Sequence, residues 1–258
     1  LDKLKSQYKS DPDVDLAAGR LYREMGLYDR AEAEYREALR LKYFSIEANV
    51  AMCELSLQKL DNPTALTYAR RACNLDPHSS KAGIALASAL IASGRLREAE
   101  QQVNKLLATD PHSAQVQYVG YKLAIERGEI TTAQKRLEAA VRLGGDPAEW
   151  LVDLSEVYKT LGDYAAAKRC LVRALSKEPY SLDALSKLAT LEEFYLRDYN
   201  KAIEQYRNIL AIDGDSVTAL AGLDRCKVKK NDIAGMLKFE LQNFVDSTVS
   251  YWSKPHDQ

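Results

Sequence analysis

Apolar residues recur along the chain at steps of three and four, which is the period of an amphipathic α-helix and not of a β-strand. In residues 80–113, two such runs are separated by Gly94. Gly94 is expected to end the first helix, since a residue without a Cβ adopts the left-handed conformation at little cost. Asp110 and Pro111 close the second run, because proline cannot extend a helix and restrains the residue before it. The segment therefore predicts a helical hairpin.

The hairpin repeats with a period of 34 residues, which is the sequence sign of a repeat architecture. One column is occupied by alanine in five successive repeats, at Ala31, Ala65, Ala99, Ala133 and Ala167. A second column holds small residues, Gly19, Cys53, Ala87 and Ser155, with Tyr121 as the exception. A third holds glycine, Gly26, Gly94, Gly128 and Gly162, with Leu60 as the exception. The first two columns are expected where two close-packed helices leave room only for small side chains.

The frame predicts how the chain is organised. Six repeats follow one another at 12–45, 46–79, 80–113, 114–147, 148–181 and 182–216, the last with one extra residue near Leu196 or Arg197. Residues 1–11 are expected to be the trailing helix of a preceding, incomplete repeat. Residues 217–252 are expected to form a degenerate seventh repeat with a C-terminal capping helix, and 253–258 a tail. Stability should come from stacking, because a lone hairpin cannot bury its apolar face.

Charge and hydropathy exclude several classes of partner. The formal net charge is −1, from 36 basic and 37 acidic residues, which argues against a nucleic-acid-binding protein. No stretch of 18 apolar residues occurs, so direct membrane insertion is not expected. The chain begins with Leu1 and shows no signal peptide, so it is read as a processed form or a fragment. A soluble protein of the cytoplasm or periplasm is predicted.

Metal and redox chemistry are not predicted either. The four cysteines form no CxxC pair and are expected to be small buried side chains: Cys53, Cys73, Cys170 and Cys226. His78 and His112 occupy equivalent turns between repeats, and nothing joins them at metal-ligand spacing, so they are expected to be loop residues. No metal and no cofactor follow from these residues.

Catalytic motifs are missing from the sequence. It has no glycine-rich phosphate loop and no nucleophile elbow. Glu192 and Glu193 are adjacent carboxylates, but neighbours on a helix do not face each other, so they are predicted to lie on a solvated face. The basic residues Lys227, Lys229 and Lys230 are likewise predicted to be a solvated helix end. The chain is predicted to be no enzyme, with no catalytic residue.

At the level of its repeats the chain resembles the tetratricopeptide repeat family. The best match is 148–181, with Leu154, Ser155, Tyr158, Gly162, Asp163, Tyr164, Ala167, Leu171, Ala174 and Pro179 at the family's positions. The repeats depart from the family at Tyr43, Gly145 and Gly214, which replace the closing proline, and at Asn62 and Pro63, expected in a turn. The resemblance implies an all-α fold, a right-handed superhelical solenoid of antiparallel helix pairs. It also implies a concave groove, lined by the first helix of each pair, that binds a peptide or a helix.

The family's groove positions can be carried over residue by residue. The predicted partner-binding residues are Val50, Glu54, Leu57, Ile84, Ser88, Ile91, Tyr118, Lys122, Ile125, Val152 and Glu156. Most are apolar, and apolar strips usually mark partner sites. We therefore expect an amphipathic segment, with the charged residues setting its register. The alternative is that the apolar residues pack between neighbouring first helices and expose little surface.

One specialised form of groove is not expected. Some family members grip a C-terminal carboxylate with a Lys and Asn cluster. The matching positions here are Leu16, Arg20, Asn49, Lys81 and Ala85, which keep only fragments of that clamp. Binding of chaperone tails is therefore not predicted.

The function predicted is a non-catalytic scaffold for protein–protein interaction, within a multiprotein assembly such as bacterial secretion, pilus or polysaccharide-export machinery. A self-assembling scaffold, in which the groove receives a second copy as a homo-oligomer, is one alternative. The other is a regulatory domain of a larger protein, which could be an enzyme.

The alanine column gives a direct test. Ala99→Tyr is expected to overpack the contact between the two helices of a repeat and to lower the free energy of unfolding by about 1–3 kcal/mol. Thermal and urea unfolding followed by circular dichroism measure the change. An unchanged unfolding transition would contradict the assignment of this column to the helix contact.

Overall fold

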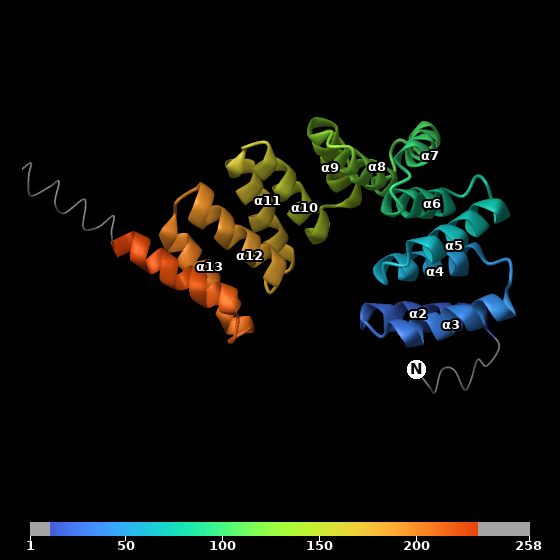
Figure 1. Cartoon of the computed structure of the whole chain (residues 1–258), viewed down its shortest axis with the longest axis horizontal. Coiled ribbons are helices and arrows are strands. Elements are labelled where there is room, and N and C mark those ends of the chain that lie inside the picture. Colours follow the sequence, from blue (N-terminus) through green and yellow to red (C-terminus); the bar gives the residue numbers. More distant parts are fainter. Residues whose placement is uncertain (1–10, 232–258) are drawn as a thin grey trace, which may run out of the picture. The chain divides into compact units, whose positions relative to one another are not determined.

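The computed structural model describes residues 11–231, and every secondary-structure element within that range is a helix. The predicted all-α stack of antiparallel helix pairs is therefore confirmed (Figure 1). The trailing helix predicted for residues 1–11 lies outside this range except for Asp11, which caps the first described helix. The part of the predicted seventh repeat and capping helix beyond residue 231, and the tail predicted at 253–258, also lie outside it.

The chain divides into two compact units, Leu1–Asp146 and Pro147–Gln258, called here the N-terminal and C-terminal units. The N-terminal unit contains α2 (Pro12–Glu24), α3 (Tyr28–Leu41), α4 (Ile46–Gln58), α5 (Asn62–Leu75), α6 (Ser80–Ala92), α7 (Leu96–Thr109), α8 (Ala114–Glu126) and α9 (Ile130–Gly144). The C-terminal unit contains α10 (Ala148–Thr160), α11 (Tyr164–Lys177), α12 (Leu182–Thr190), the π-helical turn η1 (Leu191–Tyr195), α13 (Tyr199–Ile212) and helical residues 217–231.

Side-chain caps fix the start of several helices. Serines precede several first helices, and the Ser45 hydroxyl accepts a hydrogen bond of 3.1 Å from the N–H of Ala48. Aspartates do the same for the second helices α5, α11 and α13, as Asp163 does for α11. Each cap satisfies an N–H that has no partner within the helix, which stabilises a helix by about 1 kcal/mol.

The prediction for Gly94 is confirmed, since it follows α6 with φ +69°. Leu60 holds the equivalent place after α4 with φ +59°, a conformation that costs more for a residue with a side chain. The expectation for Asn62 and Pro63 is wrong, because both lie in the first turn of α5 and not in the preceding loop. Proline is well suited there, where its missing N–H would have had no helical partner.

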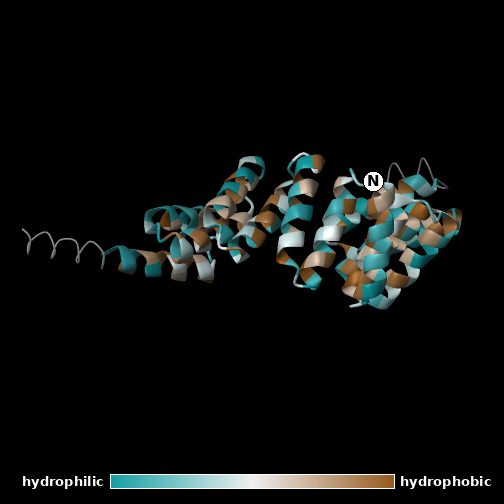
Figure 2. Ribbon diagram, turned by 90° about the horizontal axis from the view of Figure 1, so that it is seen from above, coloured by the Kyte–Doolittle hydropathy of each residue, from teal (hydrophilic) through white to brown (hydrophobic). Residues whose placement is uncertain are grey.

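The alanine column and the column of Gly19, Cys53, Ala87 and Ser155 lie in the core, whereas the glycines at the helix ends are exposed. Figure 2 shows apolar and polar residues sharing each helix. The alanines at 31, 65, 99 and 133 have no exposed surface, and Ala167 is 1% exposed. Ala99 packs in one buried cluster with Ala87 and Leu90 of the partner helix α6. Gly19 of α2 is equally constrained, since a Cβ built there would lie 2.3 Å from Cε1 of the buried Tyr35 ring.

The extra residue of the sixth repeat is accommodated by η1. There the N–H of Leu196 donates to the carbonyl of Leu191 over 3.0 Å, an i to i+5 bond that places one more residue in the turn than an α-helix does. The turn lies just before the predicted position, and Arg197 follows it with φ +53°.

The prediction that Glu192 and Glu193 lie on a solvated face is wrong. Both belong to η1 and each is 1% exposed. The physical reason is long-range pairing, because each carboxylate meets a cation from another helix, 24 or more residues away in sequence. Burial of a charge is tolerable only with such partners.

The Gly19–Tyr35 contact predicts the effect of one methyl group. Gly19→Ala should lower the free energy of unfolding by about 1–3 kcal/mol, because the buried ring must move to admit it. Gly120→Ala in α8 is the matched control, since its Cβ would meet its nearest neighbour at an ordinary 3.6 Å. The control should be neutral or more stable by up to about 1 kcal/mol, because alanine favours a helix. Urea unfolding of the two variants decides, and equal stabilities would contradict the contact.

Candidate functional site

The N-terminal unit brings together most of the predicted groove residues. They lie on three consecutive first helices, α4, α6 and α8, in which α4 contacts α6 and α6 contacts α8. Each helix contributes three, spaced by four and three residues: Val50, Glu54 and Leu57; Ile84, Ser88 and Ile91; Tyr118, Lys122 and Ile125. We call these nine residues the groove row. Spacing by three and four places each set of three along one side of its helix.

The apolar members of the groove row are half-buried. Val50 and Leu57 pack against the buried cluster that contains Cys53 and Ala85. Ile84 and Ile91 pack against the cluster around Leu90 in the same way. The sequence left two interpretations open, an exposed strip that binds a partner and a packing contact between neighbouring first helices, and these side chains have features of both. They contact neighbouring helices, and they leave a fraction of their apolar surface exposed.

The groove row carries a charged residue on each of its two outer helices, α4 and α8. Glu54 is exposed and forms an ion pair with Arg23 of α2. Lys122 is exposed and lies with its Nζ 4.8 Å from the centre of the Tyr118 ring, a cation–π contact. Since these groups are at the surface, they remain available to a ligand at little cost.

The two remaining predicted residues lie in the C-terminal unit, on α10. Val152 is only 6% exposed, so its side chain is part of the core and contributes little to the surface. Glu156 is half-buried and forms an ion pair with Lys159 one turn later.

A cluster that the sequence did not reveal surrounds Glu193. Its carboxylate accepts hydrogen bonds from the Tyr206 hydroxyl at 2.7 Å, from the Arg225 guanidinium at 2.9 and 3.0 Å, and from Lys229 Nζ at 3.3 Å. We call these four residues the Glu193 cluster. Of the basic residues predicted to form a solvated helix end, Lys227 and Lys230 are exposed, whereas Lys229 is half-buried and its Nζ also lies 4.9 Å from the centre of the Phe194 ring.

The two adjacent carboxyls differ in pKa. Burial alone would raise the pKa of Glu193, but the hydrogen bonds from Arg225, Tyr206 and Lys229 outweigh it and hold the pKa below its usual range. Burial raises the pKa of Glu192, and its single 2.6 Å ion pair with Lys168 only partly opposes this. Within the described range, Oε2 of Glu192 has no hydrogen-bond partner. Glu193 is therefore a satisfied structural anion and not a base free to react.

The thiols and histidines also fit a structural role. Burial raises the pKa of Cys53 to about 12 and that of Cys226 to about 11, so neither is a thiolate at neutral pH. Cys53, Cys170 and Cys226 are buried as predicted, and Cys73 is half-buried. His78 and His112 are exposed in their turns. Among residues 11–231, no group of three or more potential ligands could hold a metal ion, and no helix is long and apolar enough to cross a membrane.

Comparison with family models agrees with the repeat architecture. Three models, each described as tetratricopeptide repeat, match residues 16–43, 57–119 and 122–167. The matched segments include α6 in full and most of α8, but only the last two residues of α4.

Two longer proteins are similar to the chain in sequence. Superkiller complex protein 3 of Mus musculus is 25% identical over 240 residues, which cover 92% of this chain and 13% of that protein. Tetratricopeptide repeat protein 37 of Xenopus laevis is 24% identical over 129 residues, which cover 49% of this chain and 8% of that protein. The chain thus spans about an eighth or less of the length of these relatives.

Solved structures show the same fold at low identity. The Cut9 and Hcn1 complex of the APC/C superposes with a TM-score of 0.70 at 16% identity, over 87% of this chain and 44% of that one. The pilus biogenesis factor PilW superposes with a TM-score of 0.66 at 17% identity, over 83% and 97%. The pilF protein of Pseudomonas aeruginosa gives 0.61 at 15%, over 84% and 97%.

The Glu193 cluster predicts a pH dependence with a definite sign. The pKa of Glu193 is lower in the folded state than its usual value of about 4.3, so its contribution is complete above that value and is lost as pH falls through the folded pKa. Glu193→Gln should cost about 1–3 kcal/mol at neutral pH, because it removes hydrogen bonds between charged groups. The difference from the unmodified chain should shrink below about pH 4. Urea unfolding monitored by tryptophan fluorescence measures it, since Trp150 lies on α10 of the same unit.

Glu192→Gln is the matched control for this experiment. The folded-state pKa of Glu192 is raised, so its contribution is present at low pH and is lost as pH rises through the folded pKa. Removing it should cost less at neutral pH than removing Glu193, and the pH dependence should have the opposite sign. The same pH dependence in both variants would refute the assignment.

Proposed function

We propose, for a chain that belongs to the tetratricopeptide repeat family, that it is a non-catalytic scaffold whose groove row binds a peptide or an amphipathic helix of a protein partner. Proteins of this family bind protein partners. The other predicted groove residues, Val152 and Glu156, lie on α10 of the C-terminal unit and stay separate predictions.

The observation that carries the proposal is the half-buried apolar surface of α4, α6 and α8. Ile84 and Ile91 lie on the middle helix, between Val50 and Leu57 of α4 and the α8 residues. A ligand helix with apolar residues at i, i+3, i+4 and i+7 would complete their burial. Each 100 Å² of apolar surface removed from water stabilises a complex by about 2.5 kcal/mol before the entropic costs of association are subtracted.

The flanking charges support an oriented ligand. Glu54 lies in the row of α4 and Lys122 in that of α8, on opposite sides of the isoleucines. A bound helix with a basic residue near Glu54 and an acidic one near Lys122 would be favoured over its reverse. Surface charges of this kind select the register and orientation of a partner more than they add affinity.

The absence of catalysis is supported by the chemistry of the described reactive groups. The thiols of Cys53 and Cys226 are protonated at neutral pH, and Glu193 is held as an ion by three donors. A scaffold needs neither a nucleophile nor a base.

The proposal includes a place in a multiprotein assembly. The mouse relative is named as a protein of the superkiller complex, and PilW as a type IV pilus biogenesis factor. The sequence similarity reaches 92% of this chain, whereas PilW shares only the fold, so a bacterial pilus, secretion or export assembly stays a prediction. A role as one domain of a longer protein is favoured by the length of the relatives.

The test is a pull-down with the chain as bait, comparing Ile84→Asp/Ile91→Asp with the unmodified protein. The amount of partner captured by the double variant should be lower by a factor of about ten or more, because two charges would be desolvated at the centre of the contact. Its helical content by circular dichroism should be retained. Phe44→Asp/Leu60→Asp is the matched control, since both side chains are exposed outside the groove row.

A second variant separates binding from packing. Ser88→Arg adds bulk at a half-buried polar position on α6 and removes no apolar contact. It should block the partner and leave thermal unfolding unchanged. Loss of helical content together with binding in the isoleucine variant, and normal binding by Ser88→Arg, would instead assign the row to packing. Light scattering against concentration shows in parallel whether the captured partner is a second copy of the chain.

A further inference from the structure

The second helix of the first pair in the C-terminal unit, α11, has an unusual distribution of charge. It carries Lys168, Arg169, Arg173 and Lys177 and no acidic residue. The other helix of the pair, α10, carries Glu149, Asp153 and Glu156 against Lys159. The fold itself does not require this separation, because isolated surface charges contribute little to stability.

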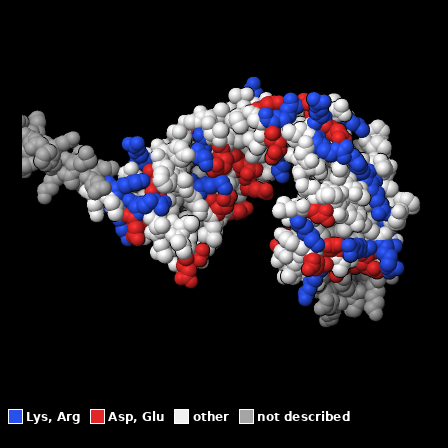
Figure 3. Space-filling model, in the orientation of Figure 1, with Lys and Arg blue, Asp and Glu red and all other residues white. Residues whose placement is uncertain are grey.

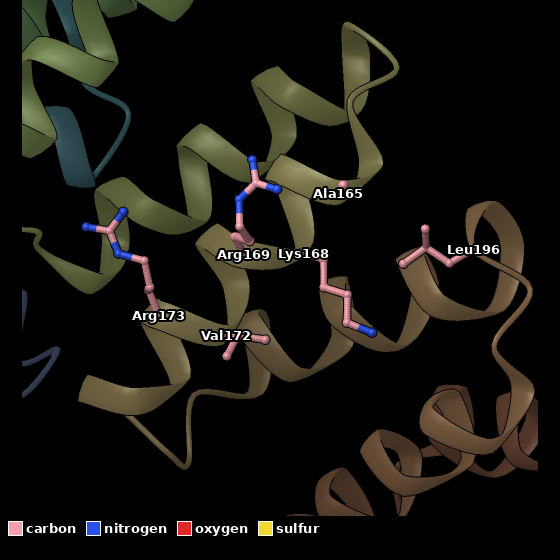
Figure 4. Close-up of a pocket in the computed structure, with 6 residues that line it drawn as sticks. All are labelled: Ala165, Lys168, Arg169, Val172, Arg173 and Leu196. Atoms are coloured by element: carbon pink, nitrogen blue, oxygen red, sulfur yellow. The ribbon is translucent and has the colours of Figure 1, made fainter.

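The basic residues of α11 border an apolar hollow. It has a volume of about 600 Å³ and is lined by Ala165, Lys168, Arg169, Val172, Arg173 and Leu196 (Figure 4). Val172 is 50% exposed and Leu196, from the turn after η1, is 36% exposed. In Figure 4 the Leu196 side chain extends toward α11 from the neighbouring segment, so the hollow lies between two elements of one unit.

The cations around the hollow differ in whether they already have a partner within the protein. Lys168 is held by its ion pair with buried Glu192 at 2.6 Å, which fixes one side of the hollow. Arg169 is exposed and makes no hydrogen bond or ion pair with the residues described. Arg173 is exposed one turn further along the helix. Two guanidinium groups four residues apart thus lie on the same side of α11 as Val172 and Ala165.

We propose that this face of α11 is a second protein-binding surface, which takes an acidic amphipathic segment of a partner. An apolar side chain of that segment fills the hollow between Val172 and Leu196, and its carboxylates pair with Arg169 and Arg173. Arginine binds carboxylates through two parallel hydrogen bonds, and it sheds water more readily than lysine does. The choice of partner follows from charge complementarity, since α11 carries basic residues and no acidic one, and Arg169 has no partner among the residues described.

A nucleic acid fits the same surface less well. Strands of RNA or DNA need a continuous track of cations and aromatic rings for stacking. Lys and Arg are interspersed with Asp and Glu over the C-terminal unit in Figure 3, and no aromatic residue lines the hollow. An apolar floor bordered by arginines suits a leucine or phenylalanine side chain among carboxylates.

The surface is tested with a fluorescein-labelled helical peptide of about 18 residues, with leucine at i, i+4, i+7 and i+11 and mainly glutamate elsewhere. Fluorescence anisotropy with the full chain measures its dissociation constant. Arg169→Glu/Arg173→Glu should weaken binding at least about tenfold, because two ion pairs become two repulsions. Lys135→Glu/Arg142→Glu on α9 changes the net charge equally at two exposed sites and should change binding less than about twofold.

The apolar part has its own pair of variants. Val172→Asp should weaken binding about as strongly as the arginine variant, whereas Val217→Asp, at a 76% exposed valine of the same unit, should not. The groove variant Ile84→Asp/Ile91→Asp should bind the peptide normally, so a failure of the proposed groove and a failure of this surface are distinguishable. The proposal is overturned if the peptide does not bind, if the α11 and α9 variants bind alike, or if a single-stranded RNA of about 12 nucleotides competes with the peptide at equal concentration.

Discussion

The contact within each helix pair rests on side chains that are small enough to let two helices meet. Ala99 is fully buried in one cluster with Ala87 and Leu90 of α6. The Tyr35 ring packs so close to Gly19 that there is no space for a Cβ at that position. Protein interiors are packed to crystal-like density, so an added methyl group there has no space to enter. This close approach fixes which side of each helix faces its partner, and thereby which residues remain for the surface.

The repeat made this contact predictable from the sequence. A residue that is small in successive copies reports a constraint that any single copy would leave ambiguous, and Gly94 similarly marks a helix end with positive φ. The same frame assigns the groove row to the first helix of each pair, and these residues lie on α4, α6 and α8. Its degree of burial was not predictable, because the exposure of Ile84 depends on how closely α4 and α8 approach α6.

The Glu193 cluster shows where the frame stops being informative. One inserted residue produces η1, which contains Glu192 and Glu193. The burial of these two carboxylates depends on cations that are distant in sequence and cannot be predicted from the local pattern. Lys168 precedes Glu192 by 24 residues, and Arg225 follows Glu193 by 32. Adjacent acidic residues on a helix are usually solvated, and only the three-dimensional arrangement of cations reverses that expectation. Features that all repeats have in common can be predicted from the sequence pattern. The contacts of an insertion found in one repeat can be learned only from the three-dimensional structure.

The same close packing separates the two surfaces proposed here. In a helix pair, the side chains at the contact are committed to the core, so each helix retains a side of its own for other molecules. On α4, α6 and α8 that side is apolar with charges of both signs beside it, whereas on α11 it is apolar with cations alone. Two surfaces of different chemistry, on different helices, need not compete for one ligand. With both proposed surfaces occupied, the chain would bring two partners together, and this is how a scaffold acts.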